Sequence, residues 1–243
     1  MVAKATVTVV SPPSRPVPPA APSGGQYFAE RPTASSRPGR VELTLPDVHL
    51  RLDTDAGVFS PGRVDPGTKL LLAELPPATE WPAGDVADVG CGYGAIAVTL
   101  ARRLADGSSG TADGRDRTVW AVDVNERARD LCRRNAAASG VGELVRVVGP
   151  EDLPPGLSVG LIASNPPIRV GKSVLHDLCR SWMERLGPDG EAWWVVQKHL
   201  GSDSLQAWMN AQGWPTERVR SRQAYRILRS TRSTRSTRST HSG

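Results

Sequence analysis

The stretch Asp88-Val-Gly-Cys-Gly-Tyr-Gly-Ala-Ile96, with its approach Asp85-Val-Ala, decides the fold of this chain. Its three glycines, Gly90, Gly92 and Gly94, allow the backbone to turn tightly and to come close to a ligand. A helix pattern follows, and a helix N-terminus directs free N–H groups and a positive dipole end at such a ligand. A strand, a glycine turn and a helix together predict an open parallel sheet that binds a nucleotide-like molecule at its carboxyl edge.

The segment Ser164-Asn165-Pro166-Pro167 is more specific than the glycines, because Gly90, Gly92 and Ala95 also fit the dinucleotide fingerprint G-x-G-x-x-A. Two prolines after a buried strand remove two backbone donors and fix two φ angles. Proline also drives the residue before it into an extended shape. We expect a rigid loop that presents carbonyls and the Asn165 amide to a donor such as an exocyclic amine, although a turn without chemistry is the alternative.

The rest of the chain alternates strand and helix patterns. Two alternating runs at 41–45 and 48–52 predict a hairpin, and Asp65 followed by Pro66 predicts the start of a helix that ends near 75. The pattern predicts an α/β fold: a doubly wound, mostly parallel sheet of seven strands, preceded by the short hairpin and helix. We expect strands at 86–89, 118–123, 144–148, 160–163 and 192–196, helices at 95–104, 125–139, 174–186 and 204–212, a turn at 187–190, and a closing antiparallel pair at 217–219 and 224–228.

The two ends of the chain differ from its centre. The 243 residues suffice for one α/β domain with extra segments. We divide them into a Pro/Ala-rich lead-in at 1–30, an extension at 31–80, the main domain at 81–229 and an Arg-Ser-Thr tail at 230–243. Lead-in and tail have little apolar material to bury, so we expect both to be disordered. The net charge of +5 suits a polyanionic partner. The basic tail is either a solvated extension or a tether for RNA.

Several site and compartment classes have no support in the sequence. No apolar run approaches the roughly 20 residues that span a bilayer, and no secretory signal is recognisable, so we expect a cytoplasmic protein. The three cysteines form no C-x-x-C pair and the four histidines show no ligand spacing, so we expect no disulfide and no metal. Cys91 lies within the glycine loop. A redox role is conceivable there, but we favour the interpretation that its small side chain fits a crowded turn.

Acidic residues follow the second and third predicted strands. Asp123 stands where a carboxylate can bind the two hydroxyls of a ribose, and the alternative is that it only caps the next helix. Glu151 and Asp152 lie after the third strand and are candidates to reach an adenine amino group. All of these groups would gather at the carboxyl edge of the sheet.

The segments Gly-Cys-Gly-Tyr-Gly, Val-Asp-Val-Asn and Ser-Asn-Pro-Pro, in this order at strand ends, resemble the class I S-adenosylmethionine-dependent methyltransferases, whose fold is Rossmann-like. Phe59-Ser-Pro and Asp65-Pro-Gly-Thr68 narrow the resemblance to the small-domain family, which includes guanine-N2 methyltransferases of small-subunit ribosomal RNA. It covers roughly residues 55–229. The resemblance implies S-adenosyl-L-methionine as cofactor, held by Asp88, Gly90, Cys91, Gly92, Tyr93, Gly94, Asp123, Asn125, Asp152 and Asn165.

The resemblance also implies that Asn165, Pro166 and Pro167 bind the target amine. Two departures concern the substrate. Ile168 follows the prolines where relatives that methylate RNA often carry an aromatic residue. The larger ribosomal enzymes have a second, degenerate half, for which residues 1–84 are too few. We therefore expect a different mode of recognition, in which the candidate substrate contacts are Ile168, Arg169, Lys172, Lys198 and His199, or else these are ordinary surface residues.

The first hypothesis is therefore an enzyme that methylates guanine N2 in ribosomal RNA, with the RNA or a ribosomal subunit as partner. Methylation of a protein glutamine amide is an alternative, against which Ile168 argues, because that family usually has Tyr there. A silent fold that binds RNA or a partner is another, and the presence of Asp123 and Asn165 argues against it. A dinucleotide oxidoreductase would have no use for the Asn-Pro-Pro segment. The sequence leaves the oligomeric state open.

Overall fold

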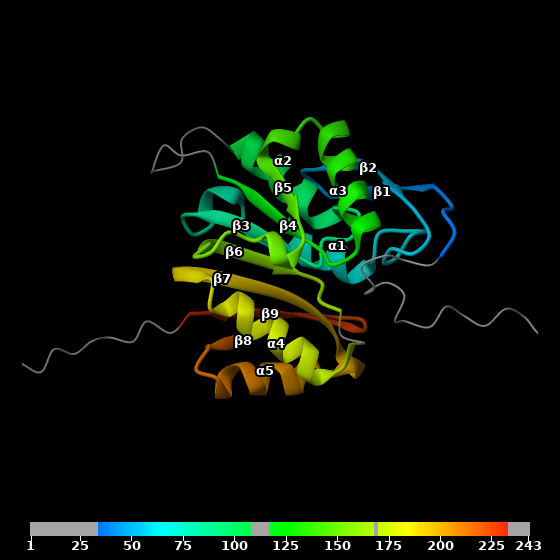
Figure 1. The fold of residues 1–243 in the computed structure, drawn as a ribbon. Helices are drawn as coiled ribbons and strands as arrows, with labels where there is room; N and C mark the ends of the chain where they lie inside the picture. The colour runs from blue at the N-terminus through cyan, green and yellow to red at the C-terminus, as the bar shows by residue number, and fades with distance from the viewer. Residues whose placement is uncertain (1–33, 108–116, 168–169, 233–243) are drawn as a thin grey trace, which may run out of the picture.

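The centre of the protein is one seven-stranded sheet with helices on both faces (Figure 1). The computed structural model describes residues 34–107, 117–167 and 170–232. The strand order is β5-β4-β3-β6-β7-β9-β8. The first five of these strands are parallel, and β9 is antiparallel to both its neighbours. The strands are β3 (Asp85–Val89), β4 (Val119–Val122), β5 (Val145–Val148), β6 (Val159–Ser164), β7 (Leu186–Gln197), β8 (Thr216–Arg222) and β9 (Tyr225–Thr231). The expected doubly wound α/β fold is confirmed.

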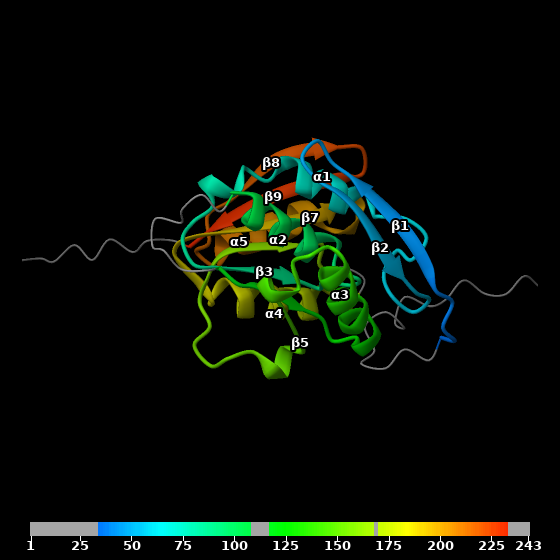
Figure 2. The same ribbon diagram turned by 90° about the horizontal axis from the view of Figure 1, so that it is seen from above.

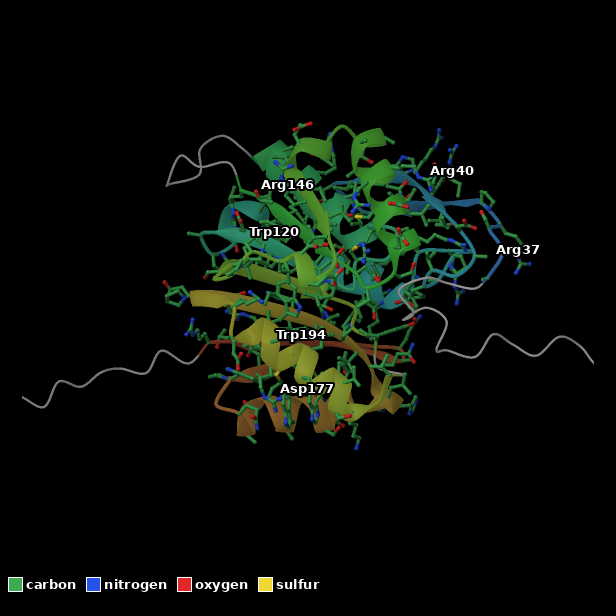
Figure 3. All side chains as sticks on the ribbon, in the orientation of Figure 1. Arg37, Arg40, Trp120, Arg146, Asp177 and Trp194 are labelled. Carbon is green, nitrogen blue, oxygen red and sulfur yellow. The ribbon has the colours of Figure 1, made fainter. Side chains whose placement is uncertain are left out.

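The helices form two layers that enclose the sheet. Trp193 of β7 packs with the helices of one layer and Trp194 with those of the other, because successive side chains of a strand point to opposite faces. Figure 3 shows Trp194 beside α4. One layer holds α1 (Pro66–Glu74), α2 (Ala95–Gly107) and α3 (Glu126–Ala138), and the other holds α4 (Lys172–Met183) and α5 (Ser202–Ala211). Short 3-10 turns are η2 (Ala78–Glu80), η3 (Gly142–Leu144), η4 (Pro150–Asp152) and η6 (Lys198–Leu200). None of the helices in the described ranges has the length and apolar composition that crossing a membrane requires.

The N-terminal hairpin lies beside α3 and outside the large sheet (Figure 2). It consists of β1 (Gly39–Thr44) and β2 (His49–Thr54), paired antiparallel as predicted. Its apolar side chains, Leu43 and Leu52 among them, belong to the same core as α1, α2 and α3. Asn135 of α3 joins the two parts, because its amide donates to the carbonyls of Asp53 and Tyr93 and accepts the Asp53 N–H. The hairpin therefore supports the glycine loop through α3.

Two expected boundaries were wrong. The segment Gly187–Gly190, expected as a turn, lies inside β7: Leu186 already pairs with Val159, and regular pairing resumes between Glu191 and Leu161. The fully buried Leu186 fixes the start of the strand, so the segment Gly187–Gly190 bulges within it. Strand β9 also continues to Thr231, beyond the predicted strand end at 228, because backbone pairing on both sides needs no apolar side chains. The expected lead-in, residues 108–116 and the rest of the tail lie outside the described residues.

Candidate active site

The candidate site lies at the edge of the sheet where the parallel strands β3, β4 and β6 end. Gly90 follows β3, Asp123 follows β4 and Asn165 follows β6. The backbone N–H groups of Gly90 and Cys91 both donate to the Val122 carbonyl, and Ser164 Oγ donates to the Val89 carbonyl at 2.6 Å. These bonds hold the ends of the three strands together, so the residues predicted to form the site are brought to one edge.

The glycine loop needs its glycines for two different reasons. Gly90, Gly92 and Gly94 have φ angles of 79°, 54° and 94°, a region that side chains rarely adopt. A Cβ at Gly94 would lie 2.8 Å from Cys132 Sγ of α3, so this glycine permits close packing. A Cβ at Gly92 would meet nothing within 4 Å, so its backbone is open to a ligand.

The side chains of Cys91 and Tyr93 point into the protein. Both are buried, and the Tyr93 hydroxyl donates to the Arg63 carbonyl at 3.5 Å. Burial and the charge of Asp65 raise the pKa of Tyr93, and a hydrogen bond with Cys132 together with burial raises the pKa of Cys91. These two predicted cofactor residues can therefore meet a ligand only through their backbone.

Asp123 connects β4 to the glycine loop. One carboxylate oxygen accepts the Gly92 N–H at 2.8 Å, and the other accepts the Asn125 N–H at 2.8 Å. Burial raises the pKa of Asp123, while these two hydrogen bonds oppose the rise. Each carboxylate oxygen has a second acceptor position. The partly buried Asp123 can thus bind further donors, such as two hydroxyls, while it holds the loop.

Asp88 is the most unusual group of the site. It is fully buried, and its Oδ2 accepts the Ala97 N–H at 2.8 Å in the first turn of α2. Its Oδ1 has no hydrogen-bond partner among the described residues. Burial raises the pKa of Asp88 to about 8, and the nearby charge of Asp123 adds to the rise. A buried oxygen without a partner is costly, so this position suits a ligand that brings a donor.

Asn165 has a fixed amide orientation. Its Nδ2 donates to Asp65 Oδ1 and to Thr68 Oγ1, both at 3.0 Å. Since a carboxylate only accepts, the face of the amide next to Asp65 must be the NH₂ group. The amide oxygen is then left for an incoming donor. Sequence reasoning assigned Asp65 only to the helix cap, although the Asp65-Pro-Gly-Thr68 motif was a signal for more.

The other predicted residues divide into buried and exposed groups. Asn125 is buried, caps α3 by accepting the Ala128 N–H and donates to the Gly57 carbonyl, so its amide serves the protein itself. Asp152 is exposed at the end of η4, beside the same edge. Lys172 begins α4, and Lys198 and His199 follow β7, all three exposed. Ile168 and Arg169 lie outside the described residues. Within the described ranges, no group of three or more His, Cys, Asp or Glu side chains is arranged to hold a metal.

Comparison with known proteins gives the family. The family model described as methyltransferase small domain matches residues 49–229. The uncharacterized protein YbxB of Bacillus subtilis is 32% identical over 208 residues, which cover 84% of this chain and 96% of that protein. Ribosomal RNA small subunit methyltransferase C of Pseudomonas putida is 38% identical over 133 residues, 54% of this chain and 36% of the relative. The same-named protein of Pseudomonas fluorescens is 30% identical over 203 residues, 77% of this chain and 56% of the relative.

A solved structure agrees with the fold. The Thermus thermophilus 16S rRNA N2 G1207 methyltransferase, solved with AdoMet and guanosine, superposes with a TM-score of 0.64 at 22% identity, covering 83% of this chain and 52% of that one. The matched part is thus between about a third and just over half of these larger ribosomal relatives. On the family match and the long alignment with YbxB, the chain belongs to the methyltransferase small domain family and is an S-adenosylmethionine-dependent methyltransferase.

Proposed function

We propose that this enzyme methylates the exocyclic N2 of a guanine in ribosomal RNA of the small subunit. The observation that carries the proposal is the orientation of Asn165, whose NH₂ group is bound by Asp65 and Thr68 so that its oxygen is left as an acceptor. Such an acceptor, next to two prolines that donate no backbone hydrogen bond, suits an amine with two hydrogens. The names of the ribosomal relatives support guanine in RNA as its source.

The cofactor fits the groups at the sheet edge. The unpartnered oxygen of Asp88 and the open backbone of Gly92 suit the polar methionine part, and the spare acceptor positions of Asp123 suit the ribose hydroxyls. We propose that Gly90, Gly92 and Gly94 surround this ligand through their backbone, with Asp152 at the adenine end. When bound, S-adenosylmethionine would supply a methyl group from its positively charged sulfur, and the sulfur–methyl bond would break to leave a neutral thioether.

The proposed role of Asn165 and Pro166 is to prepare the nucleophile. The lone pair of guanine N2 is delocalised into the ring, so the amine is a weak nucleophile. Hydrogen bonds from its two N–H groups to Asn165 Oδ1 and to the Pro166 carbonyl would aim the lone pair at the methyl group and stabilise the positive charge that nitrogen gains. The proton becomes acidic only after the C–N bond forms, so solvent can accept it.

The charges at this edge favour RNA over protein as the substrate. Arg63, Lys172, Lys198 and Arg222 are exposed, and in the described part of the chain none of them lies within 4 Å of a carboxylate. Lys198 and Arg222 adjoin the β8–β9 turn, where the Lys198 N–H donates to the Ala224 carbonyl and Arg222 pairs with Tyr225. Most of the other arginines in the described ranges are paired with carboxylates, whereas these four positive charges are left to bind phosphates.

Methyl transfer to undermodified small ribosomal subunits tests the proposal. The protein is incubated with tritiated S-adenosylmethionine, and the RNA is digested to nucleosides. We expect label in N2-methylguanosine. Label in a protein glutamine or in adenosine would overturn the substrate and keep the methyltransferase. No label in any fraction, with cofactor bound, would favour a silent fold that binds RNA.

A further inference from the structure

We infer that Asp65 is a positioning residue of the methyl transfer: from the start of α1 it fixes the amide orientation of Asn165, and Tyr225 of β9 supports it. This inference rests on the proposed role of Asn165. The carboxylate of Asp65 is buried and receives four donors. Its Oδ1 accepts the Gly67 N–H at 2.8 Å, the Thr68 N–H at 3.1 Å and Asn165 Nδ2 at 3.0 Å, and its Oδ2 accepts the Tyr225 hydroxyl at 3.1 Å.

A helix cap explains only half of these contacts. Capping requires an acceptor for the N–H groups of Gly67 and Thr68, and serine or asparagine would provide one equally well. The bonds to Asn165 and Tyr225 come instead from the ends of β6 and β9, which are 100 and 160 positions away along the chain. Asp65 therefore joins three separate elements at the edge where the candidate site lies.

The residues around Asp65 favour its hydrogen bond with Tyr225. A Cβ at Gly67 would lie 2.5 Å from Tyr225 Cδ1, so the glycine lets the tyrosine ring pack against the first turn of α1. Burial and the charge of Asp65 raise the pKa of Tyr225, so the hydroxyl stays protonated and remains a donor. The tyrosine thereby satisfies the second carboxylate oxygen and holds the carboxylate plane.

A carboxylate decides the orientation of Asn165 in a way that Thr68 cannot. A hydroxyl both donates and accepts, so Thr68 alone is compatible with either orientation of the amide. A carboxylate accepts only, and therefore excludes the orientation that would turn the Asn165 oxygen inward. Donation to a charged acceptor also polarises the amide, which makes its oxygen a better acceptor for the substrate amine.

The test compares three variants of the full-length protein. Asp65→Ser keeps the helix cap but is too short to reach Asn165. Asp65→Asn keeps both the cap and an oxygen that can accept from Asn165. Asp85→Ser is the matched control, because Asp85 also accepts a backbone N–H and a side-chain N–H, from Thr118 and Trp120, but lies at the opposite edge of the sheet. Methyl transfer to ribosomal subunits, cofactor affinity and melting temperature are measured for each.

We expect Asp65→Ser to lower kcat by about 100-fold, as misplacement of a reacting group does, and Asp65→Asn to stay within about tenfold of the parent. Cofactor affinity should be retained in both. Asp85→Ser should lower the melting temperature without a matching loss of kcat. A loss of kcat in Asp65→Ser no larger than in Asp85→Ser would overturn the inference, as would a loss that appears only in the KM for the cofactor.

A second measurement does not depend on the substrate. In ¹⁵N-labelled protein the side-chain amide protons of Asn165, identified by their absence in Asn165→Ala, report whether the NH₂ group is bound to a carboxylate. We expect a strongly shifted proton in the parent and in Asp85→Ser, and its return to an ordinary position in Asp65→Ser. An unchanged signal in Asp65→Ser would overturn the inference. If the parent labels no fraction at all, the proposed function fails while this signal still decides the contact.

Discussion

Asn165 donates its two amide hydrogens to Asp65 and Thr68, which leaves its oxygen for the amine in the proposed reaction. Asn165→Ala removes this acceptor while Pro166 and Pro167 preserve the loop. We expect turnover to fall by about 10²–10³, the effect of losing one preorganised hydrogen-bonding group. Cofactor affinity, measured by calorimetry, should be unchanged. A parallel loss of cofactor affinity would instead place Asn165 in the cofactor pocket and leave the amine without its proposed acceptor.

Asp123 holds Gly92, and we propose that its remaining acceptor positions bind a ribose. Asp123→Ala should weaken S-adenosylmethionine binding about tenfold or more, since a hydrogen bond to a charged group contributes about 1.5–3 kcal/mol. Asp130→Ala is the control: Asp130 lies on α3 two turns further on, is exposed and, among the residues that the structure describes, pairs only with Arg133. Equal affinity of the two variants in calorimetry would remove Asp123 from the ribose site.

The buried carboxyl of Asp88 should make the stability of the ligand-free protein depend on pH. Its folded pKa of about 8 lies above the ordinary value of 3.8, so the folded state holds a proton that the unfolded state releases between these values. Stability from this group is therefore fully present below about pH 4 and decreases as pH rises toward 8. Asp88→Asn should flatten this part of the profile of unfolding free energy against pH. If Asp88→Asn kept the parent's slope, the raised pKa would not belong to Asp88.

At the scale of elements, Asn135 connects the hairpin, α3 and the glycine loop. Asn135→Ala would leave the Asp53 N–H and the Tyr93 carbonyl without partners, and we expect a loss of about 1–3 kcal/mol in stability together with weaker cofactor binding. Asn210→Ala is the matched control, because Asn210 joins α5 to Thr216 by similar bonds on the other side of the sheet. It should reduce stability and leave cofactor binding intact. If both variants bind the cofactor equally, the hairpin does not support the glycine loop.

Local patterns in the sequence were enough to predict most elements and to place Asp88, Asp123 and Asn165 at strand ends on one edge of the sheet. Alternation and helix periodicity predicted the strands and helices, and the Asp65 cap is a local signal of the same kind. The bulge at Gly187–Gly190 was missed because glycine and proline predict a turn equally well whether or not a strand continues through it. The bonds from Asp65 to Asn165 and Tyr225 were missed because they join segments that only the sheet order brings together.

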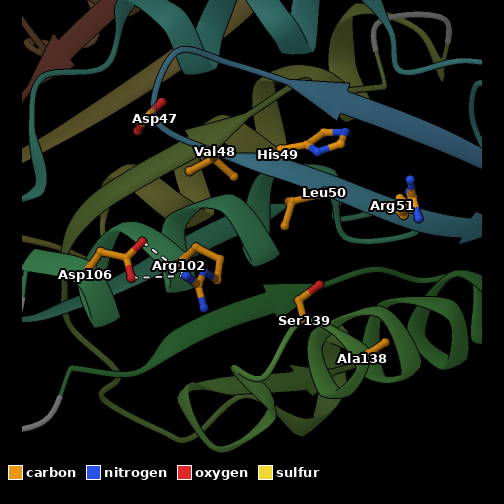
Figure 4. Close-up of a pocket in the computed structure, with 9 residues that line it drawn as sticks. All are labelled: Asp47, Val48, His49, Leu50, Arg51, Arg102, Asp106, Ala138 and Ser139. Carbon is orange, nitrogen blue, oxygen red and sulfur yellow. Dashed lines mark hydrogen bonds and ion pairs between the residues drawn. The ribbon is translucent and has the colours of Figure 1, made fainter.

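At the scale of the whole molecule, the two edges of the sheet differ in how their charges are used. A cavity of about 460 Å³ lies between the hairpin turn and the C-terminal ends of α2 and α3 (Figure 4). Both helices begin at the edge that holds the candidate site, so this cavity is at the opposite edge. Its charged side chains are largely paired: Arg102 binds Asp106 at 3.1 Å, and Asp47 binds Arg103 at 2.7 Å. The cavity therefore offers little free charge to a polyanion. The edge with Asn165, by contrast, carries several positive side chains that are not paired with carboxylates.

This difference predicts how salt will affect RNA binding. The double variant Arg63→Ala/Arg222→Ala removes two unpaired charges beside Tyr225, and each lost phosphate contact should reduce the slope of log affinity against log salt by about 0.9. The double variant Arg134→Ala/Arg146→Ala lowers the net charge by the same amount. Arg134 is exposed on α3, and Arg146 is exposed on β5, the outermost strand of the sheet (Figure 3). We expect the first variant to lose close to two units of slope with cofactor affinity unchanged, and the control to lose much less. Because both variants change the net charge by the same amount, equal slopes would mean that RNA responds to total charge alone. The edge around Asn165 would then have no special part in binding the phosphates.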